Sequence, residues 1–306
     1  ASIAGFALTL LPTPRAWLGS PQDDSATTVQ QAPKTLLELI NDDSVALHRS
    51  RLGAGTPAPL SGELDAFHNG VEQLRAYLAG DAAALAAAAH WLAAAHYQIY
   101  QVEQRYLYLR EREPARGWGI YALDTRAAGN LLVEAPAPLD EPGVLIASGW
   151  LFNALGGRAL AVAGAPRRVN ADGSLDVLRS HQTVFQVFHQ VIARRNVLQV
   201  RGYTNKNSQR LTGISPVDFR AGQVQPPTAL WVQTALPPDL DLARLRSLVG
   251  ELQVRWDETP LPNLQRDTTG SGFTELILNR PDLRQILAQA VVAGQAEAPL
   301  QVGEMQ

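Results

Sequence analysis

The sequence predicts an α/β protein in which a three-layer α/β/α sandwich with a mostly parallel sheet follows a helical hairpin or small bundle. The chain has 306 residues, of which 46% are hydrophobic and 18% charged. Apolar residues recur at helical spacing before residue 113, and short apolar runs alternate with helical stretches after residue 117. We therefore expect four regions. They are an extended N-terminal arm (residues 1–33), a helical region (34–113), an α/β domain (117–296) and a C-terminal tail (297–306).

Composition excludes several classes of function. The net charge is −3, and Lys and Arg are scattered, so the sequence offers no basic face for nucleic acid and no polybasic run for anionic lipid. The absence of Cys excludes disulfides, thiolate metal sites and a cysteine nucleophile.

The N-terminal region indicates a chain that has been processed or trimmed. The sequence starts at Ala1, and the apolar run over residues 3–11 is too short to span a bilayer and has no positive region before it. We therefore expect no transmembrane segment and an exported location, in the periplasm or cell envelope, with the cytoplasm as the alternative. Residues 12–33 are rich in Pro, Ser, Thr, Gln and Asp, which predicts an extended arm that lies on a partner.

Two helices are expected in the region that follows. Apolar residues at steps of three and four over residues 64–78 predict one amphipathic helix, which ends at Gly80. Asp81 is a good N-cap for a second, long helix over residues 82–112, which we expect to end near Pro114. This helix would carry an aromatic stripe made of Trp91, Tyr97, Tyr100, Tyr106 and Tyr108. We expect the arm and the 82–112 helix to contact other protein subunits, with internal packing as the alternative for the stripe.

After Gly117 the pattern changes to strands that alternate with helices. The expected strands cover residues 120–123, 131–134, 159–163, 197–201, 230–234 and 273–278. The expected helices cover residues 143–155, 183–193 and 242–256. This alternation favours a largely parallel sheet covered on both faces, and functional residues in such folds gather at the carboxyl ends of the strands.

Several motifs in this part of the chain resemble those of one family. They are GWGIY (117–121), LVEAPAPLD (132–140), GRALAVAGAPR (157–167), NADGSLDV (170–177), QVRGY (199–203) and FTEL (273–276). Over residues 105–295 the chain thereby resembles bacterial zinc-dependent amidohydrolases and carboxypeptidase-like proteins, the group that includes N-formylglutamate and poly-γ-glutamate hydrolases. The resemblance implies a hydrolase-like fold for residues 117–296.

The resemblance also implies where a metal site would lie. In active relatives a Pro-His-Pro turn and a following acid supply two ligands, and a His-Gly-aromatic turn supplies the third. An Ala-His-Arg segment lines the site, and a late strand contributes a Glu for proton transfer. The corresponding positions here are Ala137 and Asp140 for the first two ligands, Arg201 for the third, Pro166 for the lining histidine and Glu275 for the proton-transfer residue. We call the following set the remnant site: Glu134, Ala137, Asp140, Pro166, Arg167, Arg201 and Glu275.

These substitutions oppose zinc chemistry. A catalytic zinc needs about three protein ligands and an open position for water. Ala137 and Pro166 have no side-chain lone pair, and the guanidinium of Arg201 is a permanent cation. His181 and His189 are eight positions apart, roughly 12 Å along a helix, so one metal cannot bridge them. We therefore predict no metal, no cofactor and no catalytic residues.

A fixed positive charge would compensate the acids that remain. We expect Arg201 to form a hydrogen-bonded ion pair with Asp140, Glu275 or Glu134. The resulting hypothesis is a degenerate, non-catalytic metallohydrolase-like protein that serves as a structural or binding subunit of a larger exported or envelope complex. One alternative is an active metal-dependent amidohydrolase or peptidase with other ligands. Another is an anion- or carboxylate-binding module in which Arg167 and Arg201 hold the ligand.

Overall fold

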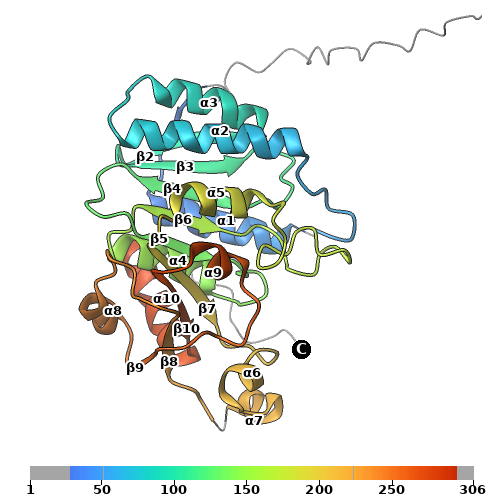
Figure 1. Cartoon of the computed structure of the whole chain (residues 1–306), viewed down its shortest axis with the longest axis vertical. Coiled ribbons are helices and arrows are strands. Elements are labelled where there is room, and N and C mark those ends of the chain that lie inside the picture. Colours follow the sequence, from blue (N-terminus) through green and yellow to red (C-terminus); the bar gives the residue numbers. More distant parts are fainter. Residues whose placement is uncertain (1–27, 51, 223, 295–306) are drawn as a thin grey trace, which may run out of the picture.

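One sheet of ten strands runs through the whole described part of the protein. The computed structural model describes residues 28–50, 52–222 and 224–294, and the strand order is β1-β2-β3-β4-β6-β5-β7-β10-β8-β9 (Figure 1). Five of the nine neighbouring pairs are parallel, so the fold is α/β with a mixed sheet. The strands are β1 (Gln30–Gln31), β2 (Tyr97–Val102), β3 (Tyr106–Glu111), β4 (Ile120–Asp124), β5 (Leu132–Ala135), β6 (Ala159–Val162), β7 (Val197–Gly202), β8 (Thr228–Val232), β9 (Leu252–Arg255) and β10 (Phe273–Leu278).

Helices cover both faces of this sheet (Figure 1). One layer contains α2 (Ser61–Leu78), α3 (Ala84–Ala94), α5 (Val184–Ile192) and α9 (Leu264–Thr269). The other contains α1 (Leu36–Arg49), α4 (Val144–Ala154), α8 (Leu242–Leu248) and α10 (Arg280–Gly294). Two short helices, α6 (Ser208–Thr212) and α7 (Pro216–Ala221), follow the carboxyl end of β7. None of the helices in the described residues is long and apolar enough to cross a membrane.

The central strands are buried on both sides because their alternating side chains enter two separate cores. Leu132 of β5 packs in the core under α2 and α5, whereas Val133 packs in the core under α4. The predicted α/β class is confirmed. The six strands expected after residue 117 are all present within a few residues, and three of the expected helices, over residues 64–78, 143–155 and 183–193, correspond to α2, α4 and α5.

The helix predicted over residues 82–112 is wrong. α3 ends at Ala94, and His96, with φ of 70°, turns the chain into the hairpin of β2 and β3. Glu103 and Gln104 have φ of 52° and 50°, as in the type I′ turn that suits a tight hairpin. Tyr, Ile and Val alternate faces along these strands, and this period of two prevails over the helical spacing that the same apolar residues also match.

The correction changes the domain picture and the predicted interface. β3 pairs with β4, so the sheet continues across the boundary predicted near residue 117. Tyr97, Tyr106 and Tyr108 are buried in the protein's own cores, so they form no aromatic surface for a partner. Trp91 alone of the predicted stripe is an exposed large residue, at 39%.

Three further predictions concern the ends of the chain and the helix over residues 242–256. That helix ends at Leu248, and the residues after it form strand β9 (Leu252–Arg255) instead. The predicted arm lies mostly outside the described residues, and its described end contributes β1, which pairs with β2. The predicted tail over residues 297–306 also lies outside them.

An aromatic cluster fastens α2 to the sheet. The Phe67 ring lies 5.0 Å from the Tyr97 ring and 5.3 Å from the Tyr121 ring, and the Tyr121 ring lies 4.6 Å from the ring of Phe188 on α5. All four rings are fully buried. Their contacts join β2, β4 and two helices of the same layer.

We expect Phe67→Ala to lower the free energy of unfolding by about 3–5 kcal/mol, because it leaves a cavity between α2 and the sheet. Urea denaturation followed by circular dichroism measures this loss. His68, which is exposed on the same helix, supplies the control: His68→Ala should change stability by less than about 0.5 kcal/mol. Equal effects of the two substitutions would contradict the packing described here.

Candidate functional site

The candidate site is a row of buried polar side chains on three neighbouring strands, which we call the polar row. Glu134 of β5 lies opposite Gln199 of β7, and Gln199 lies opposite Glu275 of β10. Residues in register point to the same face of a sheet, so all three side chains face the layer of α5 and α9. Each residue is at most 1% exposed. Buried carboxylates require partners, and the surrounding side chains supply them.

Amide and hydroxyl groups link the polar row. The Gln199 Nε2 group donates to Glu134 Oε2 at 3.2 Å, and Gln199 Oε1 accepts from Asn263 Nδ2 at 2.7 Å. Asn263 Nδ2 also donates to Glu275 Oε1 at 2.8 Å, and the Thr259 hydroxyl donates to Glu275 Oε2 at 2.6 Å. The linked groups form a continuous hydrogen-bonded path from β5 to β10.

At the other end of this path, His189 joins Glu134 to Thr269. His189 Nδ1 lies 2.8 Å from Glu134 Oε1, and its Nε2 lies 3.0 Å from the Thr269 hydroxyl. This order of groups resembles a nucleophile, base and acid triad. However, the Thr269 hydroxyl has one proton and donates it to the Gln265 carbonyl at 2.7 Å. In either tautomer His189 links Glu134 of β5 to Thr269 of α9, and His181 is exposed before α5.

Arg201 lies at the carboxyl end of β7, at the position to which the sequence motifs assigned a third metal ligand. Its guanidinium is buried, with 2% of the side chain exposed. The Nε group donates to both carboxylate oxygens of Glu141 at 3.0 Å, and Nη2 donates to Glu141 Oε1 at 2.6 Å. The Gly202 amide also donates to Glu141, at 2.9 Å. Two guanidinium nitrogens thus contact one carboxylate, which is a bidentate, charge-assisted ion pair.

The hydrogen-bonded pair expected between Arg201 and Asp140, Glu275 or Glu134 is therefore wrong, because Glu141 is the hydrogen-bonded partner. Glu141 was not selected from the sequence, although it directly follows Asp140. Arg201 Nη1 lies 3.7 Å from Glu275 Oε1, an ion pair without a hydrogen bond, and this nitrogen has no hydrogen-bond partner among the described residues. Asp140 and Glu134 have other partners.

The remaining remnant-site residues form a second group. Asp140 accepts a hydrogen bond from the Arg167 amide at 2.9 Å, and the Arg167 guanidinium pairs with Asp176 at 2.9 and 3.1 Å. Ala137 is buried and Pro166 is half-buried in the same turns. The structure thus brings Glu134, Arg201 and Glu275 into one network. It uses Asp140 and Arg167 to join two loops, with Asp176 as a partner that the sequence analysis did not select.

Burial and nearby charges shift the pKa values of Arg201 and Glu275. Burial raises the pKa of Glu275, and the Arg201 charge and the hydrogen bonds from Thr259 and Asn263 offset part of this increase. Burial lowers the pKa of the Arg201 guanidinium, but the charges of Glu141 and Glu275 outweigh this effect and leave it raised. Arg201 is therefore a permanent cation between two carboxylates.

This arrangement supplies charge compensation without Lewis acidity. In the part of the chain that the structure describes, no three His, Asp or Glu side chains are grouped to hold a metal ion. A guanidinium cannot polarise a water molecule as zinc does.

Comparisons of the chain with protein-family models, curated proteins and solved structures gave no match. The family resemblance thus rests on the sequence motifs alone.

We expect Arg201→Ala to destabilise the protein by about 3–5 kcal/mol, because it leaves Glu141 buried without a counter-charge. The double variant Arg201→Leu with Glu141→Leu removes both charges and should lose much less, as measured by urea denaturation. Arg168→Ala, at an exposed position two residues beyond Pro166, is the control and should stay within about 0.5 kcal/mol. Wild-type stability of Arg201→Ala would disprove the buried pair.

Glu275 should make stability depend on pH. Its ordinary pKa is 4.5, and the folded protein raises it. The folded state therefore holds this proton more tightly, so stability decreases as pH rises from the unfolded pKa through the folded pKa. The variant Glu275→Gln has no titrating group at this position, so it lacks this pH-dependent contribution to stability. Denaturation curves between pH 4.5 and about pH 8 should show a steeper decline for wild type than for Glu275→Gln, and parallel curves would refute the assignment.

Proposed function

We propose that this protein is a non-catalytic, metallohydrolase-like protein that serves as a structural or binding subunit of a larger complex. The observation that supports this proposal is the buried Arg201–Glu141 pair at the carboxyl end of β7. In the resembled family that position holds a metal ligand, and here it holds a cation that repels metals. Of the two acids that the resemblance places at the site, Glu275 lies 3.7 Å from the Arg201 guanidinium, and Asp140 accepts a hydrogen bond from the Arg167 backbone amide.

At the carboxyl edge of the sheet, Arg201 connects the segment after β5 with β7 and β10. Glu141 follows β5, Arg201 ends β7 and Glu275 lies on β10, so one cation joins segments far apart in the sequence. These contacts favour one arrangement of the three segments, and Arg201 Nη1 is the nitrogen of this guanidinium that has no hydrogen-bond partner among the described residues. Buried, paired side chains at this edge suit a structural or binding role better than a site that must admit water and substrate.

Two alternatives remain from the sequence. An active metal-dependent amidohydrolase or peptidase would need a ligand set that the described residues do not group together. An anion-binding module based on Arg167 and Arg201 is disfavoured because both guanidinium groups are already paired, with Asp176 and Glu141.

Some large apolar side chains are exposed on the described surface. Val217 on α7, Trp256 after β9 and Val292 on α10 are exposed by 76%, 65% and 83%. Single exposed apolar residues are common, so they indicate no particular partner.

An exported or envelope location also belongs to this proposal. Fractionation of cells that express the full-length protein tests it.

We expect the purified protein to contain far less than one zinc per chain after dialysis against zinc and then buffer, because the expected ligands at 137 and 201 are absent. Elemental analysis measures the metal. Hydrolysis of N-formylglutamate and poly-γ-glutamate should not exceed the rate in protein-free buffer. About one zinc per chain, with hydrolysis that Glu275→Gln abolishes, would establish the enzyme alternative instead.

A further inference from the structure

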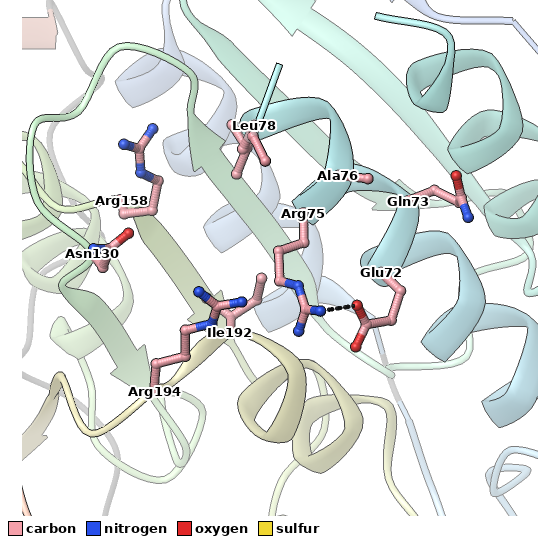
Figure 2. A pocket seen from close by; sticks show the side chains of 10 residues that line it. Glu72, Gln73, Arg75, Ala76, Leu78, Asn130, Arg158, Ile192 and Arg194 are labelled. Atoms are coloured by element: carbon pink, nitrogen blue, oxygen red, sulfur yellow. Dashed lines mark ion pairs between the residues drawn. The ribbon is translucent and has the colours of Figure 1, made fainter. Parts of the chain in front are cut away.

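A groove lies at the amino-terminal ends of β5, β6 and β7, at the opposite edge of the sheet from Arg201. Its volume is about 630 Å³, within the range of small-molecule sites. Its walls come from the C-terminal half of α2, from residues that precede β5 and β6, and from the end of α5 (Figure 2). No residue of the polar row or the remnant site lines it.

The charges that line the groove are unbalanced. The lining residues include three arginines, Arg75, Arg158 and Arg194, and one acidic residue, Glu72. Arg75 pairs with Glu72 at 2.8 Å, and neither Arg158 nor Arg194 has a carboxylate partner within the described residues. Three positive charges less one negative charge leave an excess of two in a chain whose net charge is −3. Such a local excess attracts anions.

Arg158 is a fixed part of this charge. Its Nε group donates to the Gly129 carbonyl at 3.2 Å, its Nη1 group to the Asp124 carbonyl at 2.7 Å, and its Nη2 group to the Ala127 carbonyl. Each terminal nitrogen keeps a second N–H group. A guanidinium held by backbone carbonyls loses little further freedom when a ligand binds.

Arg194 adds an independent sign of function. It has φ of 38°, and Arg195 beside it has φ of 62°, a left-handed conformation that costs an ordinary residue about 1–2 kcal/mol. Arg194 makes no hydrogen bond or ion pair with any residue that the structure describes. Figure 2 shows the Arg194 and Arg75 guanidinium groups directed to the same part of the groove, near Ile192. Two cations brought together repel each other unless an anion lies between them.

The ends of two helices provide a simpler explanation for part of this arrangement. The C-terminal ends of α2 and α5 carry partial negative charge, and Arg75 and Arg194 stabilise them. This role does not account for Arg158, which precedes a strand. It also does not account for two consecutive arginines in a left-handed turn, where Gly or Asn would cost less.

We propose that this groove binds a small organic anion with at least two negative charges, either a phosphate monoester or a polycarboxylate. Guanidinium groups match the oxygens of both. The charged groups of the ligand contact Arg194 and Arg75, whose guanidinium groups are directed to the same part of the groove, its apolar part lies against Ile192, and Arg158 adds positive charge to the wall. The proposal does not depend on the function proposed for the complex.

Calorimetric titration of the full-length protein with phenyl phosphate and with citrate, at constant ionic strength, tests this site. We expect at least one probe to bind with a dissociation constant of about 1 mM or lower. The probe that binds identifies the class, and the affinity should fall as salt is raised. Arg194→Gln and Arg75→Gln should each weaken binding by about tenfold or more. Arg168→Gln, an equal charge change at the opposite edge of the sheet, should have no effect.

Two results would overturn the proposal. One is the absence of saturable binding by both probes. The other is binding by Arg194→Gln and Arg75→Gln with the affinity of Arg168→Gln, which would leave helix capping as the role of these arginines. Denaturation curves of the three variants identify any loss of folding, and Arg158 is left unchanged because it also holds three backbone carbonyls.

Discussion

The polar side of the central sheet depends on one buried cation. Three carboxylates, of Glu134, Glu141 and Glu275, are removed from water, and each requires a donor. Arg201 supplies the charge for two of them, and His189 holds the third. Because Gln199 and Asn263 connect these pairs, the linked side chains constrain β5, β7, β10 and α9 together. Loss of the cation would disturb this whole network, whereas loss of a surface pair would not.

Much of this fold can be predicted from the sequence because the central strands are short apolar runs between helices and turns. The hairpin of β2 and β3 could not be predicted in this way. Its Tyr, Ile and Leu residues match helical spacing as well as alternation, and the choice is made by burial on both faces of the sheet. Local sequence also gives no sign of the left-handed turn at Glu103 and Gln104, since neither residue is Gly or Asn.

The location of the candidate site could be predicted from the sequence, but the residues that pair within it could not. The motifs directed attention to Arg201 and Glu275, which do lie within 3.7 Å of each other. The hydrogen-bonded partner is Glu141 and not Asp140, because the conformation of the loop after β5 decides which of two adjacent acids enters the core. The pair of Glu134 and His189 spans 55 positions, and only the packing of α5 on the sheet brings it together.

The arginines at the two edges of the sheet differ in whether they have carboxylate partners. At the carboxyl edge every guanidinium of the remnant site already has a carboxylate partner, so a further anion would have to displace one. At the amino edge Arg158 is held by carbonyls and Arg194 by no described residue, so their charges are available to an anion from solution. An anion from solution would therefore meet paired guanidinium groups at the carboxyl edge and guanidinium groups without a carboxylate partner among the described residues at the amino edge. The groove at the amino-terminal edge is where the charge and the space for binding such an anion coincide.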